Sequence, residues 1–349
     1  MNKRIYLSPP HMSGYEMQYI KEAFEQNWIA PLGPNVDGFE KEMTIYLAEE
    51  DIYAVALSSG TAAIHLSLIL AGVQKDDVVI CQSFTFAATA NPIIYQGAIP
   101  VFIDSETDTW NMDPNLLEDA IKELKRKNKK PKAVVAVDLY GMPARLNEIR
   151  EVCSKYDLIL IEDAAEALGS SYFGKKAGTF GDFGILSFNG NKIITTSGGG
   201  MLITHKKEIA DKARYLATQA REPFPHYEHV TIGYNYRMSN ILAGIGRGQL
   251  KVIDQRVTRR REIFNQYQSL LRNIEAIEFP AEPDGFISNR WLTTMIIKPG
   301  SSQVTPETIR LELEKYNIES RPLWKPMHLQ PVYKNCDSWI TGISEQLFR

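Results

Sequence analysis

Three short segments of this 349-residue chain carry residue types whose order and spacing suit chemistry. The first, Ser-Ser-Gly-Thr-Ala-Ala at 58–63, directly precedes an apolar helical pattern. Free backbone N–H groups and the positive end of the helix dipole make such a helix start an anion-binding site. The same hydroxyl groups also serve as ordinary helix caps, so this segment alone leaves both interpretations open.

The other two segments place an acid and a lysine after apolar runs. Asp163 follows Leu-Ile-Leu-Ile at 158–161, and open α/β sheets bind ligands at the carboxyl ends of such buried strands. Lys192 ends the polar loop Ser-Phe-Asn-Gly-Asn-Lys at 187–192, ahead of three glycines at 198–200. Taken singly, Asp163 could cap a turn and Lys192 could be a solvated surface lysine.

Together, the three segments match what pyridoxal 5′-phosphate (PLP) requires of a protein. A lysine can bind the cofactor aldehyde as an imine, an acid can keep the pyridine nitrogen protonated, and a helix start can take the phosphate. The glycine run precedes a strand pattern and opens no helix, so it is not a dinucleotide-binding fingerprint. The residues therefore predict a PLP site.

The elements that must position these residues alternate between apolar runs and helical patterns, which predicts a parallel sheet with crossover helices. Strands are expected at 78–80, 99–103, 133–137, 158–161, 184–188 and 201–203, and helices at 62–70, 113–125, 146–155 and 206–220. One helix is expected from Ser239 to about Asn273, followed by a strand, a helix and a strand at 291–297, 305–315 and 318–322. We therefore expect an α/β fold with a large domain over 1–250, whose mostly parallel sheet is flanked by helices, and a smaller α+β domain over 251–349.

Composition narrows the class further. The chain is 44% hydrophobic and carries a formal net charge of −3, so it has a sizeable core and no overall field for nucleic acid or an anionic membrane. The basic clusters at 122–132 and 256–261 lack interleaved aromatics and are expected to be solvated helix faces.

Polar residues and prolines interrupt the uncharged stretch 78–103, which predicts strand, loop, helix and strand in place of a membrane span. Three dispersed cysteines and a start unlike a secretory signal predict a cytoplasmic protein.

Five longer motifs carry a family resemblance. They are Ser-Gly-Thr-Ala-Ala (59–63), Glu-Asp-Ala-Ala-Glu-Ala-Leu-Gly (162–169), Ser-Phe-Asn-Gly-Asn-Lys (187–192), Gly-Tyr-Asn-Tyr-Arg-Met-Ser-Asn (233–240) and Arg-Pro-Leu-Trp-Lys-Pro-Met-His (321–328). In this order, over nearly the whole chain, they resemble the DegT/DnrJ/StrS nucleotide-sugar aminotransferases, a group within the aspartate-aminotransferase superfamily of PLP fold type I. The last motif is most similar to enzymes that aminate UDP-4-keto-6-deoxy-N-acetylhexosamines.

The resemblance implies a role for each matching position. Lys192 would hold the cofactor and carry protons, and Asp163 would pair with the pyridinium. Phe86 would stack on the ring, although a core aromatic is the open alternative. The residues implied to hold the phosphate are Gly60, Thr61, Ser187 and, from the neighbouring subunit of a homodimer with shared active sites, Asn235. Those implied to line the substrate pocket are Arg237 and His328.

Two features depart from the family pattern. Glu166 stands where many members have His or Gln beside the 3-oxygen of the cofactor, and a carboxylate there would repel a phenolate. We therefore expect Glu166 to be protonated, turned away or paired with a cation. The chain also ends at Arg349, where relatives usually continue with a strand and a helix, so a truncated or incomplete small domain is expected.

The resemblance implies an aminotransferase that moves an amino group from glutamate to a keto nucleotide-sugar in amino-sugar or surface-glycan biosynthesis. One alternative is a PLP-dependent sugar dehydratase, against which Lys192 argues because those relatives have His at this position. Another is a non-catalytic PLP-fold protein with a regulatory role. No metal is expected, since the pair His226 and His229 has no third ligand motif nearby and suits a solvated loop.

Overall fold

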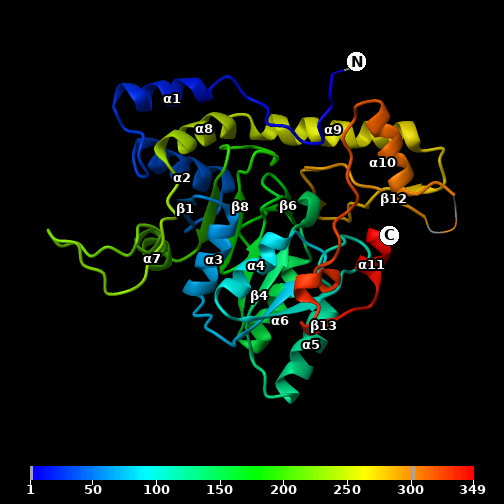
Figure 1. Ribbon diagram of the computed structural model, residues 1–349, viewed down its shortest axis with the longest axis horizontal. Helices are drawn as coiled ribbons and strands as arrows, with labels where there is room; N and C mark the ends of the chain where they lie inside the picture. The colour runs from blue at the N-terminus through cyan, green and yellow to red at the C-terminus, as the bar shows by residue number, and fades with distance from the viewer. Residues whose placement is uncertain (1–2, 299, 301–302) are drawn as a thin grey trace.

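The computed structural model describes residues 3–298, 300 and 303–349 of the chain. At its centre is an eight-stranded sheet in the order β1-β9-β8-β5-β4-β2-β3-β13 (Figure 1). Its strands are β1 (Tyr53–Leu57), β2 (Val78–Gln82), β3 (Ile99–Ile103), β4 (Pro131–Val137), β5 (Ile159–Asp163), β8 (Phe183–Ser187), β9 (Gly200–Thr204) and β13 (Ser338–Trp339). All six strands expected in the first two-thirds of the chain are confirmed. Strand β1 was not expected, because its alanines weaken the β-branched signal.

The strand register brings the chemically active segments to one edge of the sheet. Strands β2, β3, β4, β5 and β8 run parallel, and β9 runs antiparallel to both of its neighbours. Asp163 pairs with Val137 at the end of β4 and with Ile185 of β8, so the carboxyl ends of β4 and β5 meet there, and β8 continues to Ser187. Gly200 of β9 pairs with both Leu57 and Ser187, so the ends of β1 and β8 lie level with each other on the two sides of β9.

Helices cover both faces of the sheet, as expected for strands that are apolar on both sides. Helices α3 (Gly60–Leu70), α4 (Ala87–Tyr95) and α7 (Lys207–Ala217) pack on the face that buries Val79 and Cys81. Helices α5 (Pro114–Arg126) and α6 (Leu146–Tyr156) pack on the opposite face, which buries Val78 and Ile80. The uncharged stretch 78–103 is therefore β2, a loop, α4 and β3, as predicted. Among the described residues, no helix has the length and apolar character needed to cross a membrane.

The prediction of one long helix from 239 to 273 is wrong, because the chain forms two helices there. Helix α8 (Asn240–Leu250) ends before Val252, whose φ of −118° and ψ of 11° leave the helical region, and α9 (Ile253–Leu271) begins after it. Leu250, Val252 and Ile253 are all buried. One continuous helix would turn Val252 roughly to the opposite face from Leu250, so burying both requires the break. These helices and α1 (Glu16–Glu25) lie along one side of the molecule above α2 (Pro34–Leu47) (Figure 1).

The last hundred residues only partly follow expectation. The expected helix is confirmed as α10 (Pro306–Lys315), but the strand at 291–297 shrinks to β12 (Ile296–Ile297), which pairs with β10 (Ile277–Glu278). The expected strand at 318–322 is absent from these described residues, where Ile318 forms a single bridge to Ile5. The remaining elements are β6 (Ser171–Tyr172), β7 (Lys175–Lys176), β11 (Phe286–Ile287), α11 (Ile343–Phe348) and the short helices η1 (Leu139–Gly141), η2 (Met327–Leu329) and η3 (Pro331–Tyr333).

The end of the chain returns to the large sheet. Strand β13 pairs in parallel with β3, and Met327 and Tyr333 are buried in the core beneath α3 and α4. Figure 1 shows this red segment beside the cyan and green elements of the large domain. The domain boundary between residues 250 and 251 stays a prediction. The C-terminal region contributes strand β13 to the sheet of the large domain.

Candidate active site

A cavity of about 400 Å³ lies at the carboxyl edge of the sheet. Strand ends, the start of α3 and the loop after β8 form its walls, as topology predicts for ligand sites in open α/β sheets. Seven of the residues singled out in the sequence line it: Gly60, Thr61, Phe86, Asp163, Glu166, Ser187 and Lys192.

The start of α3 carries a helix cap and backbone N–H groups that the helix leaves without an acceptor. Ser59 is the cap, since its Oγ accepts a hydrogen bond from the backbone N–H of Ala62 at 3.0 Å. The N–H groups of Gly60 and Thr61 have no acceptor within the helix, because the first N–H groups of any helix have none. A Cβ on Gly60 would lie 3.1 Å from Cβ of Ser187, so glycine allows this hydroxyl to approach the helix start closely. The helix-cap interpretation is therefore confirmed for Ser59, and anion binding by Gly60 and Thr61 stays a prediction.

Asp163 is a buried carboxylate with few partners. Its Oδ2 accepts a hydrogen bond from Thr89 Oγ1 at 2.8 Å, and its Oδ1 accepts one from the N–H of Ala165 at 3.2 Å. Burial raises the pKa of Asp163, while the Thr89 hydrogen bond and the charge of Lys192 oppose that rise. A positively charged group beside this carboxylate would offset the cost of its burial.

Lys192 points into the cavity, and the alternative of a solvated lysine is wrong. Its side chain is only 12% exposed, and Nζ lies 3.3 Å from Oε1 of Glu166. Nζ also lies 4.3 Å from the ring centroid of Trp291, a cation–π distance. The lysine is thus held between a carboxylate and an aromatic face.

Glu166 takes one of the three states expected for it, because it is paired with a cation. Besides Lys192, its Oε2 accepts a hydrogen bond from the backbone N–H of Tyr140 at 2.7 Å. Burial raises the pKa of Glu166 to about 6, with the Lys192 charge and the Tyr140 N–H opposing and the Asp163 charge adding to the rise. A carboxyl group poised near neutral pH is suited to exchanging a proton.

Aromatic side chains also line the cavity. Phe86 is 56% exposed and lies 5.4 Å from Trp324, centroid to centroid, so the alternative of a core aromatic is wrong. Thr89, Trp291 and Trp324 also line the cavity and were missed in the sequence. Thr85, in the loop before α4, lies 2.8 Å from Thr89, oxygen to oxygen. Trp324 belongs to the 321–328 motif, which could have pointed to it, whereas nothing local marks Trp291.

The other three residues singled out in the sequence do not line this cavity. Asn235 is exposed and forms a bridge with Thr218. Arg237 is buried, and its Nη1 donates to Oε1 of Glu40 at 2.8 Å and to the Ala56 carbonyl. These bonds would have to break before Arg237 reached a substrate in this chain's own cavity.

His328 is held by the large sheet and α11. Its Nδ1 lies 2.6 Å from Ser83 Oγ, and its Nε2 lies 3.3 Å from Oε1 of Glu345. The expected substrate contacts of His328 and Arg237, and the expected contact of Asn235 with the partner's cofactor phosphate, stay predictions.

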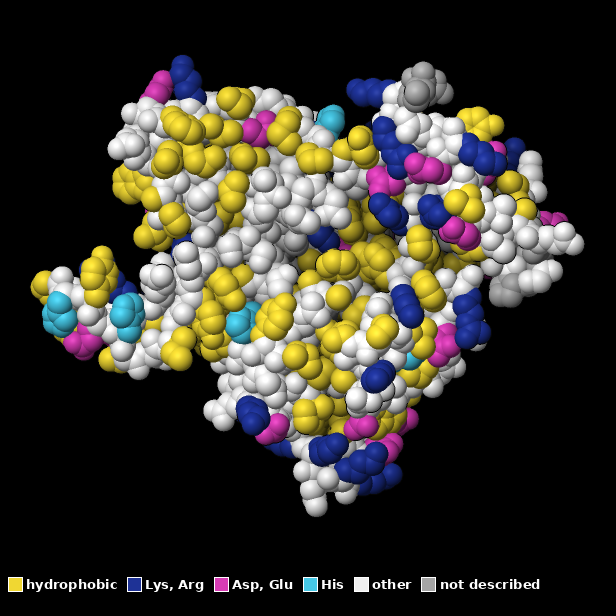
Figure 2. All heavy atoms as spheres, viewed as in Figure 1, with side chains coloured by type: hydrophobic (Ala, Val, Ile, Leu, Met, Phe, Trp, Pro, Cys, Tyr) yellow, Lys and Arg dark blue, Asp and Glu magenta, His cyan; other side chains and the backbone are white. Residues whose placement is uncertain are grey.

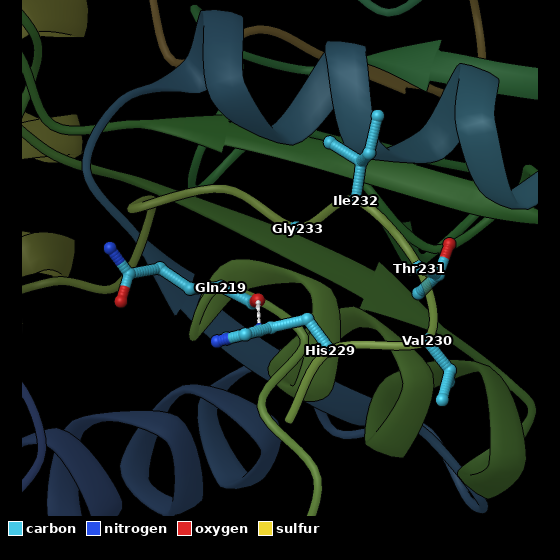
Figure 3. Close-up of a pocket in the computed structure, with 6 residues that line it drawn as sticks. All are labelled: Gln219, His229, Val230, Thr231, Ile232 and Gly233. Atoms are coloured by element: carbon cyan, nitrogen blue, oxygen red, sulfur yellow. Dashed lines mark hydrogen bonds between the residues drawn. The ribbon is translucent and has the colours of Figure 1, made fainter. Parts of the chain in front are cut away.

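The two histidines with metal-like spacing lie on a protruding segment. Nε2 of His226 is 3.1 Å from a carboxylate oxygen of Glu228, and Nδ1 of His229 is 2.9 Å from the carbonyl of Gln219, the bond drawn in Figure 3. Within residues 3–298, 300 and 303–349, no three His, Cys, Asp or Glu side chains are grouped as a metal site would require.

The donor set fits PLP. Unpaired N–H groups and a hydroxyl at the start of α3 suit a phosphate, and buried Asp163 suits a protonated pyridine nitrogen. Lys192 is the only lysine among the described residues that line this cavity, so it is the amine available to an aldehyde.

The chain matches the DegT/DnrJ/EryC1/StrS aminotransferase family over residues 10–344. EpsN of Bacillus subtilis (strain 168), provisionally named a pyridoxal phosphate-dependent aminotransferase, is 56% identical over 333 residues, which cover 95% of this chain and 84% of EpsN. The GDP-perosamine synthase of Escherichia coli O157:H7 is 36% identical over 333 residues, which cover 95% of this chain and 87% of the synthase. Among solved structures, Spr1654 of Streptococcus pneumoniae in its PMP form, provisionally named a sugar aminotransferase, has a TM-score of 0.90 at 28% identity, covering 99% of this chain and 91% of that one.

The fold and the cavity define a PLP-dependent transferase of fold type I. The chain belongs to the DegT/DnrJ/EryC1/StrS aminotransferase family and uses PLP as its cofactor. This confirms the family, the fold class and the cofactor expected from the sequence.

Proposed function

We propose that this aminotransferase moves an amino group from glutamate to the keto group of a nucleotide-sugar. The observation that carries the proposal is the meeting of Lys192 and Asp163 in one cavity at the carboxyl edge of the sheet. Sugar aminotransferases and a GDP-perosamine synthase among the relatives support a sugar as the acceptor. When bound, PLP supplies an aldehyde that carries the amino group and a ring that accepts electrons.

Each side chain of the cavity has a distinct task in this proposal. Gly60, Thr61 and Ser187 bind the phosphate, and Asp163 keeps the ring nitrogen protonated. Lys192 binds the cofactor and, once released from it, moves the proton between the two carbons that exchange the amino group. Phe86 stacks on the ring and limits the entry of water.

We further propose a UDP-4-keto-6-deoxy-N-acetylhexosamine as the acceptor. The support for this class is the motif Arg-Pro-Leu-Trp-Lys-Pro-Met-His at 321–328, whose Trp324 lines the cavity. The GDP-perosamine synthase relative, whose name contains a different nucleotide, makes a GDP-sugar the principal competitor.

We also propose that the working form is a homodimer whose active sites are shared. Segment 219–233 protrudes from the molecule (Figure 1) and exposes Phe224, Tyr227, Val230 and Ile232. Figure 2 shows hydrophobic and histidine side chains gathered on this protrusion, and a hollow of about 360 Å³ lies at its base (Figure 3). Exposed apolar side chains on a protrusion favour a partner surface, and Asn235 lies at the start of the return path into the fold.

A substrate panel tests the proposed function. Purified enzyme is loaded with PLP, given glutamate and each of several UDP-, GDP- and dTDP-linked keto sugars, and assayed for 2-oxoglutarate and amino sugar. We expect stoichiometric formation of both with the UDP-N-acetyl sugar. Dehydrated sugar without 2-oxoglutarate would support the dehydratase alternative, and bound cofactor with no reaction on any sugar would support a regulatory role.

A further inference from the structure

We propose that Glu166 is the proton partner of Lys192: it holds the free lysine as an ammonium and accepts its proton when the lysine bonds to the cofactor. This inference rests on the proposed assignment of Lys192 to the cofactor and on no choice of sugar. It gives Glu166 a catalytic role, because its carboxylate touches the nitrogen that reacts.

Elimination within the cavity points to Glu166. Among the described residues that line it, the titratable side chains are Asp163, Glu166 and Lys192. Both oxygens of Asp163 already accept hydrogen bonds, from Thr89 and Ala165, whereas Oε1 of Glu166 is the carboxylate atom within 3.3 Å of Nζ. Glu166 is therefore the acceptor that a proton leaving Lys192 meets first.

The pair is also held in place by a shared support. Asn289, which is fully buried, donates from Nδ2 to the backbone carbonyl of Glu166 at 2.8 Å. Its Oδ1 accepts from the backbone N–H of Trp291 at 2.8 Å, and the indole of Trp291 donates to the Asn191 carbonyl at 2.7 Å. One amide thus holds the backbone of Glu166 and the backbone of Trp291, the residues on either side of the lysine, which makes Asn289 a positioning residue.

The charges around Glu166 favour the transfer. Its neighbours are Lys192 from the loop after β8, the Tyr140 N–H from η1 and Asp163 from β5. In the free protein the Lys192 charge stabilises the carboxylate. Once Lys192 is no longer an ammonium, the remaining burial and the Asp163 charge favour the protonated carboxyl, so the proton stays on Glu166.

The step balances without any other reactant. The lysine ammonium gives one proton to the Glu166 carboxylate. A bound aldehyde would supply the carbon to which the lone pair of the resulting amine would bond, and the aldehyde oxygen would leave as water together with the two remaining amine protons. A neutral carboxyl also removes the repulsion that a carboxylate would exert on a phenolate oxygen nearby.

The first measurement uses the full-length chain stripped of cofactor, with circular dichroism and reloading as checks of its integrity. It is treated with trace acetic anhydride at pH 7.5, and acylation of Lys192 is compared with that of exposed Lys212 by peptide mass mapping. Loss of the opposite charge should make Lys192 at least about tenfold more reactive in Glu166→Gln. The matched control is Glu118→Gln, which removes a carboxylate paired with the exposed Lys155 and should leave Lys192 unchanged.

The second measurement follows the proton itself. The infrared difference spectrum of cofactor-loaded minus cofactor-free protein should show the stretch of a protonated carboxyl in the wild type and in Asp163→Asn. The spectrum of Glu166→Gln should lack this band. The inference is overturned if the wild type gains no such band, or if Glu166→Gln keeps it. Should Glu166→Gln fail to fold, the wild-type spectrum and the acylation of Glu166→Asp decide the matter. Cofactor that never attaches to Lys192 would instead overturn the proposed function.

Discussion

The cavity at the carboxyl edge of the sheet and the protruding segment 219–233 differ in what holds them. Buried hydrogen bonds and an ion pair within one chain fix Asp163, Glu166 and Lys192. The protruding segment instead exposes Tyr227, Val230 and Ile232, each more than 70% exposed. The contacts that hold these three cavity side chains thus lie within one chain, whereas our proposal assigns completion of the site to a second copy.

The largest effect expected on the cavity side is the loss of Lys192. Lys192→Ala should lower transamination by at least about 10⁴-fold, because it removes both the cofactor linkage and the proton carrier. In the wild type, borohydride reduction followed by peptide mapping should place the phosphopyridoxyl label on Lys192. A label on any other lysine would contradict the assignment.

The next largest effect concerns Asp163. Asp163→Asn should keep bound cofactor but lose about 10²–10³ in rate, because a neutral amide cannot keep the ring nitrogen protonated. Steady-state kinetics with quantified cofactor content measures this. Thr89→Val, which removes only the hydrogen bond to Oδ2, should cost about tenfold or less. Equal losses in the two variants would show that Asp163 acts only by holding the local structure.

On the protruding side, Asn235→Ala should weaken cofactor binding by about 10–150-fold, the effect of losing a hydrogen bond of about 1.5–3 kcal/mol to a charged phosphate. Dimerisation should weaken with it, because ligand binding and assembly are linked. Equilibrium dialysis and analytical ultracentrifugation measure the two effects. Unchanged cofactor affinity in a stable dimer would place Asn235 outside the site.

Mixed subunits sharpen the same comparison. Lys192→Ala and Asn235→Asp proteins, each inactive alone, are combined and allowed to exchange subunits. If sites are shared, one site of the mixed dimer carries both lesions and the other is intact, so activity returns. A mixture that stays inactive, although mass measurement shows heterodimers, would falsify the shared-site proposal.

The smallest effect is the pH dependence of stability at Glu166. Its folded pKa of about 6 lies above the ordinary value of 4.5, so the folded state holds this proton more tightly than the unfolded state. The stabilisation is full below pH 4.5 and is lost as the pH rises through 6, a change of about 2 kcal/mol. From pH 4 to pH 7, the free energy of unfolding of the wild type should therefore fall by about 2 kcal/mol more than that of Glu166→Gln. Denaturation at both pH values measures this. If the difference in free energy of unfolding between the wild type and Glu166→Gln did not change with pH, the raised pKa would be contradicted.

Two expectations show where reasoning from the sequence stops. The helix at 239–273 has a helical pattern throughout, yet burial of both Leu250 and Val252 breaks it. The segment around Ser338 gives no strong strand signal, yet its pairing with β3 makes it part of the main sheet. In both cases contacts between residues distant in the chain outweigh local propensity.

Sequence alone predicted six of the eight strands of the central sheet, the helix after Ser59 and the chemical identity of the Asp163 and Lys192 pair, because apolar periodicity and residue type are local properties. Only the tertiary structure decided that Glu166 turns toward Lys192, that Trp291 lies against the lysine, and that Arg237 is engaged by Glu40. Asn289 and Trp291 are about a hundred residues or more from the side chains they position, so no local pattern marks them. Charge pairing in a buried cavity depends on which side chains face one another after folding, and that is a property of packing.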